Sequence, residues 1–340
     1  MLLSFIAWGA YFRRLRLYPL TVTVMRSGLF STPYIYICKF MLLSVERPEE
    51  FEKTLLLMNN VYMAMSIAGS DSSGGAGIQA DLKTMSALGV FACSVVTAVT
   101  CQNTLGVSDV LPIEEKYVKG QINAVLADLP VKAVKIGMLH DEAIARCVAD
   151  CLQDNGFKGS VVLDPVMVAT SGSLLARENL RDALIRYLFP VASLVTPNLH
   201  EAEVLSNMKK IETEEEMREA ARRIADLGAK AVLVKGGHLE NKRELKDILL
   251  RKQDGRLVFE NFVSEKIDSQ NTHGTGCSLS SAIASYCAMG CDLEQSVGKA
   301  VEFVHNAILN AKDLFLGHGH GSLNHFFKPE KLVIYEDNRE

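Results

Sequence analysis

The sequence predicts an α/β protein of three layers, with helices covering both faces of a mostly parallel central sheet. From about residue 63 onward, short apolar runs alternate with amphipathic helical stretches, which is typical of buried parallel strands joined by crossover helices. This part of the 340-residue chain contains no internal repeat, low-complexity tract or linker. One α/β/α domain is therefore the simplest organisation.

Six apolar runs are the expected strands. They span residues 64–68, 93–99, 133–136, 160–163, 193–195 and 231–234. One of the intervening helices can be followed in detail. Thr213 and Glu216 form a capping box, and Gly228 stops the helix. Its apolar stripe is Met217, Ala220, Ala221, Ile224 and Leu227. Ligands of such sheets bind at the carboxyl ends of the strands, so the loops there are the first place to seek a site.

Residues 1–62 are expected to lie outside this domain, which we place at 63–330. The segment contains the only tryptophan, Trp8, and lacks the periodicity of the later sequence. Its longest uncharged runs have 12 residues, which is too short to cross a bilayer. We expect that translation starts downstream, at Met58, Met63 or Met65; a transit peptide is the alternative.

Charge and cysteine usage exclude several classes of function. The net charge is −4, and the first 45 residues carry five Lys/Arg and no acid, so the remainder carries −9. An acidic body argues against a nucleic-acid surface, and we expect no membrane partner either. The eight cysteines form no C-x-x-C pair and no zinc-like spacing, which fits a reducing cytoplasm.

A glycine-rich segment, residues 68–81, follows the first strand. Four glycines within nine residues allow close approach to a ligand, and Asp71 and Asp81 can accept hydrogen bonds. The segment matches neither a Walker A motif nor G-x-G-x-x-G, so nucleotide binding does not follow. A flexible turn with a helix cap is the alternative interpretation.

Polar residues stand at the ends of four later strands. Gln102 can donate and accept in one plane, which suits the edge of an aminopyrimidine, although a loop amide is the commoner case. Asp164 and Glu201 can organise magnesium and water, but Glu201 with Asn198 is equally a helix start. Lys235 at the exit of a buried strand is costly unless it meets an anion.

The most specific motif is residues 271–277, NTHGTGC, which leads into a helix. A glycine-rich turn at a helix start presents free N–H groups to phosphate charge. Cys277 then lies in the first turn of the helix, where a thiol pKa is expected to be lowered. An inert packed cysteine after a glycine turn is the alternative.

The stretch from 64 to 328 resembles the hydroxymethylpyrimidine and phosphomethylpyrimidine kinases of thiamine biosynthesis, in the ribokinase-like superfamily. The matching segments are GSDSSGGAGIQADLKT, TAVTCQNT, KIGML, DPVMVATSG, TPNLHEAE, VLVKGGH and NTHGTGC. Sugar kinases of the superfamily carry Asp where this chain has Cys277. That difference puts a simple carboxylate base in doubt.

The resemblance implies an ATP- and Mg²⁺-dependent kinase, commonly a homodimer, that acts twice on a pyrimidine. The residues it implies for the pyrimidine are Gln102, Gly69, Asp81, Met138 and Val166. Those implied for the ATP phosphates are Lys235, Thr272 and the amides around Gly274 and Gly276, with Asp164 and Glu201 for magnesium. Cys277 is implied near the attacking oxygen, as base or as part of the anion hole with Gly274 and Gly276.

Three other functions remain open on the sequence. A pyridoxine-type vitamin kinase is the nearest, because its ring also bears a hydroxymethyl group. A non-catalytic binding module is disfavoured, because it has no need of the phosphate-handling residues Asp164, Glu201 and Lys235. A thiol hydrolase built on Cys277 is least favoured, since no nearby pattern singles out a base.

Overall fold

The computed structural model describes residues 60–167, 179–237, 243–253 and 255–335. The chain divides into two units, Met1–Met58 and Asn59–Glu340, and the fold described here lies in the second. The expected separation of residues 1–62 from the domain stays a prediction, because the chain before residue 60 lies outside the described residues. Parts of two matching segments, residues 168–172 and His238, also lie outside them.

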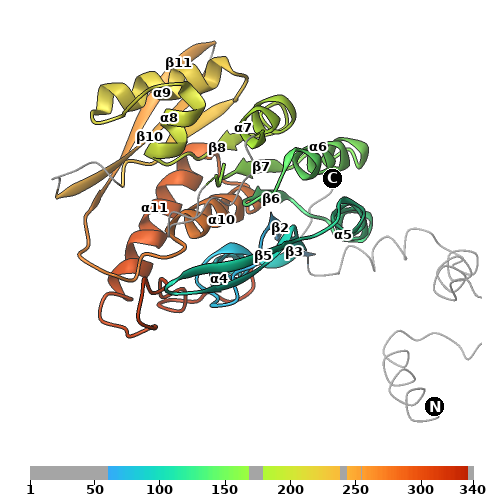
Figure 1. Ribbon diagram of the computed structural model, residues 1–340, viewed down its shortest axis with the longest axis horizontal. Coiled ribbons are helices and arrows are strands. Elements are labelled where there is room, and N and C mark those ends of the chain that lie inside the picture. The colour runs from blue at the N-terminus through green and yellow to red at the C-terminus, as the bar shows by residue number, and fades with distance from the viewer. Residues whose placement is uncertain (1–59, 168–178, 238–242, 254, 336–340) are drawn as a thin grey trace, which may run out of the picture. The chain divides into compact units, whose positions relative to one another are not determined.

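The central sheet has eight strands in the order β11-β10-β9-β8-β7-β6-β2-β3 (Figure 1). The strands are β2 (Met63–Ala68), β3 (Phe91–Val96), β6 (Ala133–Ile136), β7 (Ser160–Leu163), β8 (Leu194–Val195), β9 (Ala231–Val234), β10 (Glu244–Gln253) and β11 (Arg256–Glu265). Every pair from β3 to β9 is parallel, and β10 and β11 add an antiparallel hairpin at one edge. The expected mostly parallel sheet is confirmed.

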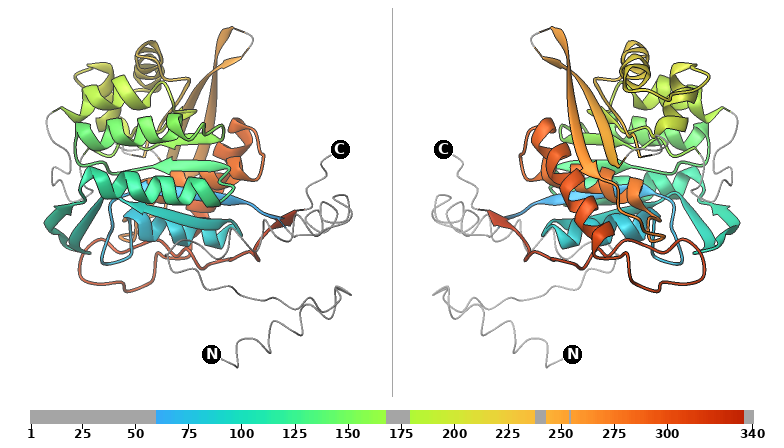
Figure 2. Two further views of the ribbon diagram at one scale, coloured as in Figure 1. Left: turned by 90° about the vertical axis from the view of Figure 1, so that its right-hand side faces the viewer. Right: turned by 90° about the vertical axis from the view of Figure 1, so that its left-hand side faces the viewer.

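Helices cover both faces of the sheet, which confirms the three layers (Figure 2). On one face lie α4 (Gly77–Ala87), α10 (Thr275–Ala288) and α11 (Leu293–Leu309). On the other lie α5 (Glu115–Asp128), α6 (Glu142–Asp154), α7 (Leu180–Ala183) with its π-helical continuation η2 (Leu184–Leu188), α8 (Leu199–Ser206) and α9 (Glu214–Asp226). No helix in the described ranges is long and apolar enough to cross a membrane.

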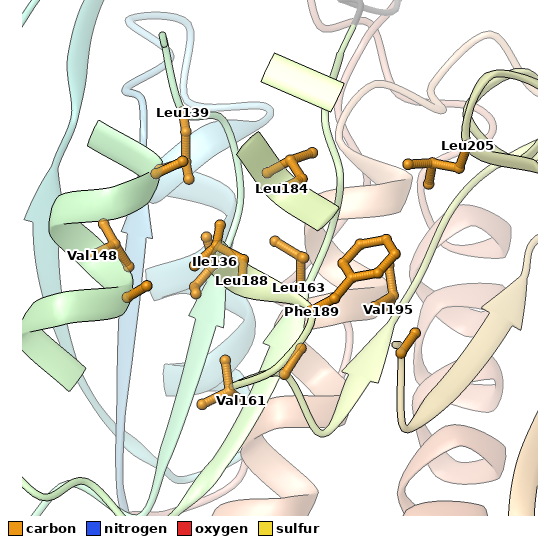
Figure 3. Packing of buried hydrophobic residues seen from close by; sticks show 14 of the residues in the cluster. Ile136, Leu139, Val148, Val161, Leu163, Leu184, Leu188, Phe189, Val195 and Leu205 are labelled. Atoms are coloured by element: carbon orange, nitrogen blue, oxygen red, sulfur yellow. The ribbon is translucent and has the colours of Figure 1, made fainter. Parts of the chain in front are cut away.

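The strands are apolar throughout because each is buried on both faces. In β7, Val161 and Leu163 pack into the cluster under α6, η2 and α8, whereas Val162 packs into the cluster under α10. Figure 3 shows Leu163 beside Leu188 and Phe189 of the former cluster. This two-sided burial fixes where β7 ends, and therefore where the following Asp164 emerges.

The expected strand 93–99 is wrong at its end, because the chain leaves the sheet after Val96. Thr97 lies at the break, where its amide donates to Ala68 O (3.0 Å) and its hydroxyl to Met138 O (2.7 Å). Beyond it, β4 (Ala98–Asn103) pairs with β5 (Gly106–Pro112) in a separate two-stranded sheet. The two hydrogen bonds of Thr97 thus mark the point where the chain leaves the sheet. The strand β4 that follows carries Gln102.

A further pair of short strands brings the two ends of the described chain together. β1 (Asn60–Val61) pairs antiparallel with β12 (Ile334–Tyr335). Tyr62 stacks on Tyr335 with ring centroids 4.4 Å apart. Residues 60–62 and 334–335 make these contacts, and both groups lie outside the span 63–330 that the sequence indicated for the domain.

Candidate active site

A cavity of about 890 Å³ opens at the carboxyl ends of the parallel strands. Eleven of the twelve expected site residues line it. They are Gly69, Gln102, Met138, Asp164, Val166, Glu201, Lys235, Thr272, Gly274, Gly276 and Cys277. The twelfth, Asp81, is not among the lining residues. The sheet topology thus gathers residues that are more than 200 positions apart in the sequence.

The start of α10 forms the anion-binding centre of the cavity. Gly274 precedes the helix with φ of 85°, and a side chain there would overlap the carbonyl oxygen of Gly75. The first helical bond is made by Ser278, whose amide donates to Gly274 O (2.8 Å). The amides of Gly276 and Cys277 precede that bond and have no helical acceptor. Together with the positive end of the helix dipole, they suit a phosphoryl group.

Cys277 does not have the lowered pKa that its place in the first turn predicts. Burial raises the pKa of its thiol to about 11, and the nearby carboxylates of Asp81 and Asp164 add to the rise. The charge of Lys135 and a backbone hydrogen bond from Gly77 oppose this but do not reverse it. The expectation was therefore wrong: burial dominates and raises the pKa of the thiol, which is neutral at pH 7.

Lys235 and two carboxylates form the charged centre of the cavity. Lys235 leaves β9 and places its Nζ 2.8 Å from Asp164 Oδ1, which follows β7. Burial alone would lower the pKa of Lys235, but Asp164 and Glu201 outweigh burial and raise it, so the ammonium is retained. A side chain at Gly276 would approach Lys235 Nζ to 3.3 Å, which places the helix start beside this charge.

Glu201 caps a helix, which is one of the two roles that the sequence left even, and it also lies at the cavity. Its carboxylate accepts from the Asn198 amide (2.9 Å), and Asn198 Oδ1 accepts from the Glu201 amide (2.9 Å), so a capping box starts α8. Yet Glu201 also lines the cavity. Burial raises its pKa to about 7, Lys235 opposes the rise, and Asp164 adds to it. A second cation near Glu201 would favour its ionised carboxylate and so offset the free-energy cost of burying that charge.

Asp164 and Glu201 are the residues that suit magnesium. No group of three or more His, Cys, Asp or Glu side chains within the described ranges is arranged to hold a metal. Mg²⁺ typically uses one or two carboxylates and completes its shell with water and substrate phosphates. Two carboxylates beside a phosphate-binding helix start match that pattern, so the residues present fit the ion.

One end of the cavity suits a flat ring. A side chain at Gly69 would come within 2.9 Å of Met138 Sδ, so glycine there leaves the space that Met138 occupies. Val166 and Gln102 also line this end. Gln102 reaches the cavity from β4, the strand that departs from the sheet after Thr97.

Asp81 has a structural position rather than the expected contact with the ring. Its carboxylate is fully buried and pairs with Lys135 Nζ at 2.8 and 2.9 Å. The hydroxyls of Ser66 and Ser281 also donate to it. These four contacts use its acceptor sites, so Asp81 lies behind the cavity wall and holds Lys135, which does line the cavity.

Sequence reasoning missed Lys135 and His273 as site residues. Lys135 stands in the middle of the apolar strand β6 and is fully buried, and a charge in such a strand is itself a signal. His273 lies inside the NTHGTGC motif, but no partner was assigned to it. In the structure its Nε2 lies 2.9 Å from Asp71 Oδ2 and 3.1 Å from Gln102 Nε2.

The cavity continues beyond the charged centre between the β10–β11 hairpin and α11. This part has an apolar wall of the kind that accepts a flat base. Its apolar residues are Leu245, Ile267, Leu279, Val301, Val304 and Ile308. The phosphate-binding centre thus lies between two regions that can each hold a planar group.

Comparison with known proteins agrees with this arrangement. A family model described as phosphomethylpyrimidine kinase matches residues 71–324. A hydroxymethylpyrimidine/phosphomethylpyrimidine kinase of Rhizobium meliloti is 47% identical over 266 residues, covering 78% of this chain and 97% of that protein.

Two solved structures are also similar. The phosphomethylpyrimidine kinase of Clostridium difficile 630 is 41% identical with a TM-score of 0.62, covering 73% of this chain and 98% of that one. Pyridoxal kinase of Bacillus subtilis, solved as an ADP complex, is 35% identical with a TM-score of 0.69, covering 78% and 98%. The architecture is thus the ribokinase-like fold, and the chain belongs to the phosphomethylpyrimidine kinase family of phosphotransferases.

Proposed function

We propose that this protein transfers phosphoryl groups from ATP to 4-amino-5-hydroxymethyl-2-methylpyrimidine, first to the hydroxymethyl group and then to the resulting phosphate, in thiamine biosynthesis. The observation that carries the proposal is the order of groups along one cavity. An amide at Gln102 can read a ring edge, the helix start at Gly274 can hold the transferring phosphoryl group, and Lys235 lies beside that start. The names of the relatives support the choice of ring.

In the first step the hydroxymethyl oxygen attacks the γ-phosphorus of ATP. A new O–P bond forms, the bond from the γ-phosphorus to the β–γ bridging oxygen breaks, ADP leaves, and the hydroxyl proton passes to water. The amides of Gly276 and Cys277 and the ammonium of Lys235 stabilise the charge on the transferring group. Gln102, Met138 and Val166 hold the ring so that the hydroxymethyl group points at the helix start.

In the second step an oxygen of the monophosphate attacks the γ-phosphorus of a second ATP, which forms a P–O–P bond and releases ADP. No proton has to be removed here, because the monophosphate is mostly a dianion at neutral pH. The raised pKa of Cys277 argues against a resting thiolate that acts as base in either step. We therefore assign its neutral S–H to the anion hole, where it serves both steps.

ATP occupies the part of the cavity between the β10–β11 hairpin and α11, and its phosphates point toward Lys235 and Thr272. Asp164 and Glu201 are the residues that would hold Mg²⁺, and the ion would neutralise phosphate charge there. The raised pKa of Glu201 supports this assignment, since a bound cation restores its carboxylate.

Pyridoxal kinase is the second candidate, favoured by the similarity to the Bacillus subtilis enzyme. A non-catalytic module is disfavoured because Lys235, Asp164 and the helix start are assembled for phosphate. A thiol hydrolase is disfavoured because the pKa of Cys277 is raised to about 11.

An ADP-release assay with three acceptors tests the proposal: the pyrimidine alcohol, its monophosphate and pyridoxal, each with Mg·ATP. We expect kcat/KM for the pyrimidine alcohol to exceed that for pyridoxal. A higher value for pyridoxal would move the assignment to the second candidate. A homodimer and a cytoplasmic location are also part of the proposal, and light scattering after size exclusion measures the oligomeric state.

A further inference from the structure

His273 joins two residues of the ring-binding end of the cavity. Its Nε2 lies 2.9 Å from Asp71 Oδ2 and 3.1 Å from the side-chain amide of Gln102. The three residues come from the loop after β2, the end of β4 and the turn before α10. Both His273 (8% exposed) and Asp71 (1%) are buried in the wall of the cavity.

Asp71 determines which way the His273 hydrogen points. The Asp71 carboxylate accepts from the amides of Ser73 (2.9 Å), Gly75 (3.1 Å) and Ala76 (2.7 Å) and from the Ser73 hydroxyl (2.7 Å). Burial alone would raise its pKa, but the hydrogen bonds from His273, Ser73 and Ala76 hold the pKa well below its usual range. An ionised carboxylate only accepts. His273 Nε2 therefore carries a hydrogen, whether the ring is neutral or cationic.

That hydrogen in turn orients the Gln102 amide. The two ends of a side-chain amide have the same shape, so their partners decide which end faces which group. As placed in the structure, Gln102 Nε2 faces His273 Nε2 and Gln102 Oε1 faces Thr100 Oγ1. An N–H at His273 Nε2, shared between Asp71 and Gln102, would then meet another N–H, so the amide is turned by 180° and its oxygen faces His273. The amide nitrogen is then on the other side, toward Thr100 Oγ1.

A contact on the other side of the amide requires the same orientation. The Thr100 hydroxyl lies 3.4 Å from the Gln102 atom placed as Oε1, a long contact, and its single hydrogen is donated to Ser70 O at the shorter distance of 2.8 Å. Only lone pairs of the hydroxyl remain for Gln102, so the amide nitrogen faces Thr100. Two independent partners thus fix the same order of oxygen and nitrogen.

We propose that His273, held by Asp71, is a positioning residue that fixes the Gln102 amide for an aminopyrimidine edge and so sets the preference for that ring over a pyridine. This inference rests on the proposed function. An aminopyrimidine presents a ring nitrogen that accepts beside an amino group that donates. A fixed amide offers one N–H and one oxygen in the matching order, whereas the pyridine of pyridoxal has no amino donor.

The local backbone is built around the His273 ring. A Cβ at residue 75 would come within 2.6 Å of His273 Cδ2, so glycine is required for the ring to lie there. The amide of His273 also donates to Gly321 O at 2.9 Å, which anchors its main chain from a third segment. The ring is therefore held in place before any substrate arrives, and ordering it costs nothing on binding.

Three variants of His273 test the proposal. His273→Gln keeps an N–H near the position of Nε2, His273→Asn places its amide too close to the main chain, and His273→Leu has no donor. Steady-state constants are measured for the pyrimidine alcohol, pyridoxal and ATP, and thermal unfolding verifies that each variant is folded. The Asn and Gln variants are both polar, so they remain informative if Leu prevents folding.

We expect the Asn and Leu variants to raise the KM for the pyrimidine alcohol by roughly tenfold, the usual size of a lost buried hydrogen bond. The KM for ATP should stay within about twofold of the wild-type value. The ratio of kcat/KM for the pyrimidine alcohol to that for pyridoxal should fall by roughly tenfold. His273→Gln should restore most of the pyrimidine affinity.

Two results would overturn the proposal. One is a folded Asn variant with the wild-type KM for the pyrimidine. The other is a Gln variant as impaired as the Asn variant, because that would make the histidine ring, and not its donor, the important feature. A wild-type enzyme that accepts pyridoxal and rejects the pyrimidine would instead refute the proposed function, so the two failures are distinguishable.

Discussion

Neutralising Asp81 should destabilise the fold, because it leaves Lys135 charged and unpaired inside the protein. Both side chains are fully buried, and Lys135 Nζ contacts the two Asp81 oxygens at 2.8 and 2.9 Å. Breaking such a buried pair from one side typically costs about 3–5 kcal/mol. For a domain of this size that corresponds to a fall in Tm of roughly 10 °C. Asp81→Asn is the matching variant, because it removes the charge and keeps the size of the side chain. Ser66 and Ser281 donate to different oxygens of Asp81, so the amide oxygen of Asn keeps an acceptor for one of the two hydroxyls.

The direction in which the Lys135–Asp81 pair makes stability depend on pH follows from the pKa of Lys135. In the wild type burial alone would lower the pKa of Lys135, but Asp81, with Cys277 and Asp164, raises it above the unfolded value. The stabilising contribution is therefore complete below the unfolded pKa of about 10.4 and is lost only as pH rises through the folded value. In Asp81→Asn burial prevails and lowers the Lys135 pKa. The unfolded chain then binds more protons, so stability should rise with pH between about 7 and 10.

Urea unfolding at pH 7 and 9.5 measures both effects. The double variant Asp81→Asn with Lys135→Met is the matched control, because it buries no charge and should recover most of the lost stability. An Asp81→Asn protein with wild-type stability but a raised KM for the pyrimidine would refute the reasoning. That result would return Asp81 to the ring contact that the sequence indicated.

Three other predictions concern the site and the chain start. Cys277→Ala should slow both phosphorylations by a similar factor in single-turnover assays, and a loss confined to the first step would restore the base role. The rate of alkylation of Cys277 should be low at pH 8 and rise toward pH 11. Gly69→Ala, whose Cβ lies 2.9 Å from Met138 Sδ, should raise the pyrimidine KM severalfold and leave the ATP KM unchanged, as titration calorimetry can verify. A chain beginning at Met58 should keep full activity and Tm, whereas one beginning at Met65 loses two residues of β2, which pairs with both β3 and β6, and should unfold at a lower temperature.

Local sequence signals predicted the parallel strands and α9 well. The boundaries of β6, β7 and β9 agree with the apolar runs because each is buried on both faces and ends at a polar residue or glycine. The capping box at Thr213 is present, but Leu227 is 37% exposed and lies past the end of α9. A helical stripe predicts burial only while the helix continues.

The antiparallel parts of the fold could not be read in the same way. β10 and β11 carry charged residues on their exposed positions and belong to the edge of the sheet, so they lack a continuous apolar run. β4 continues directly from β3 in sequence, and the break at Thr97 depends on hydrogen bonds to Ala68 and Met138, which come from distant segments.

Motifs indicated most of the site, but the balance between competing terms required the structure. The dipole at the start of α10 and the burial of Cys277 act on its pKa in opposite directions, and the sequence reveals only the first. Similarly, the sequence is compatible with Asp81 either contacting a ligand or pairing with a cation. Only the structure shows Lys135 beside it. The pairing of His273 with Asp71 joins residues 202 positions apart, which no local pattern contains.

Phosphorus NMR of the purified protein with Mg·ATP and the pyrimidine alcohol tests the central claim most directly. We predict that a monophosphate signal grows first and then declines as two coupled diphosphate resonances replace it, with two ADP formed per diphosphate. Unchanged alcohol beside rapid phosphorylation of pyridoxal, or release of inorganic phosphate alone, would contradict the account.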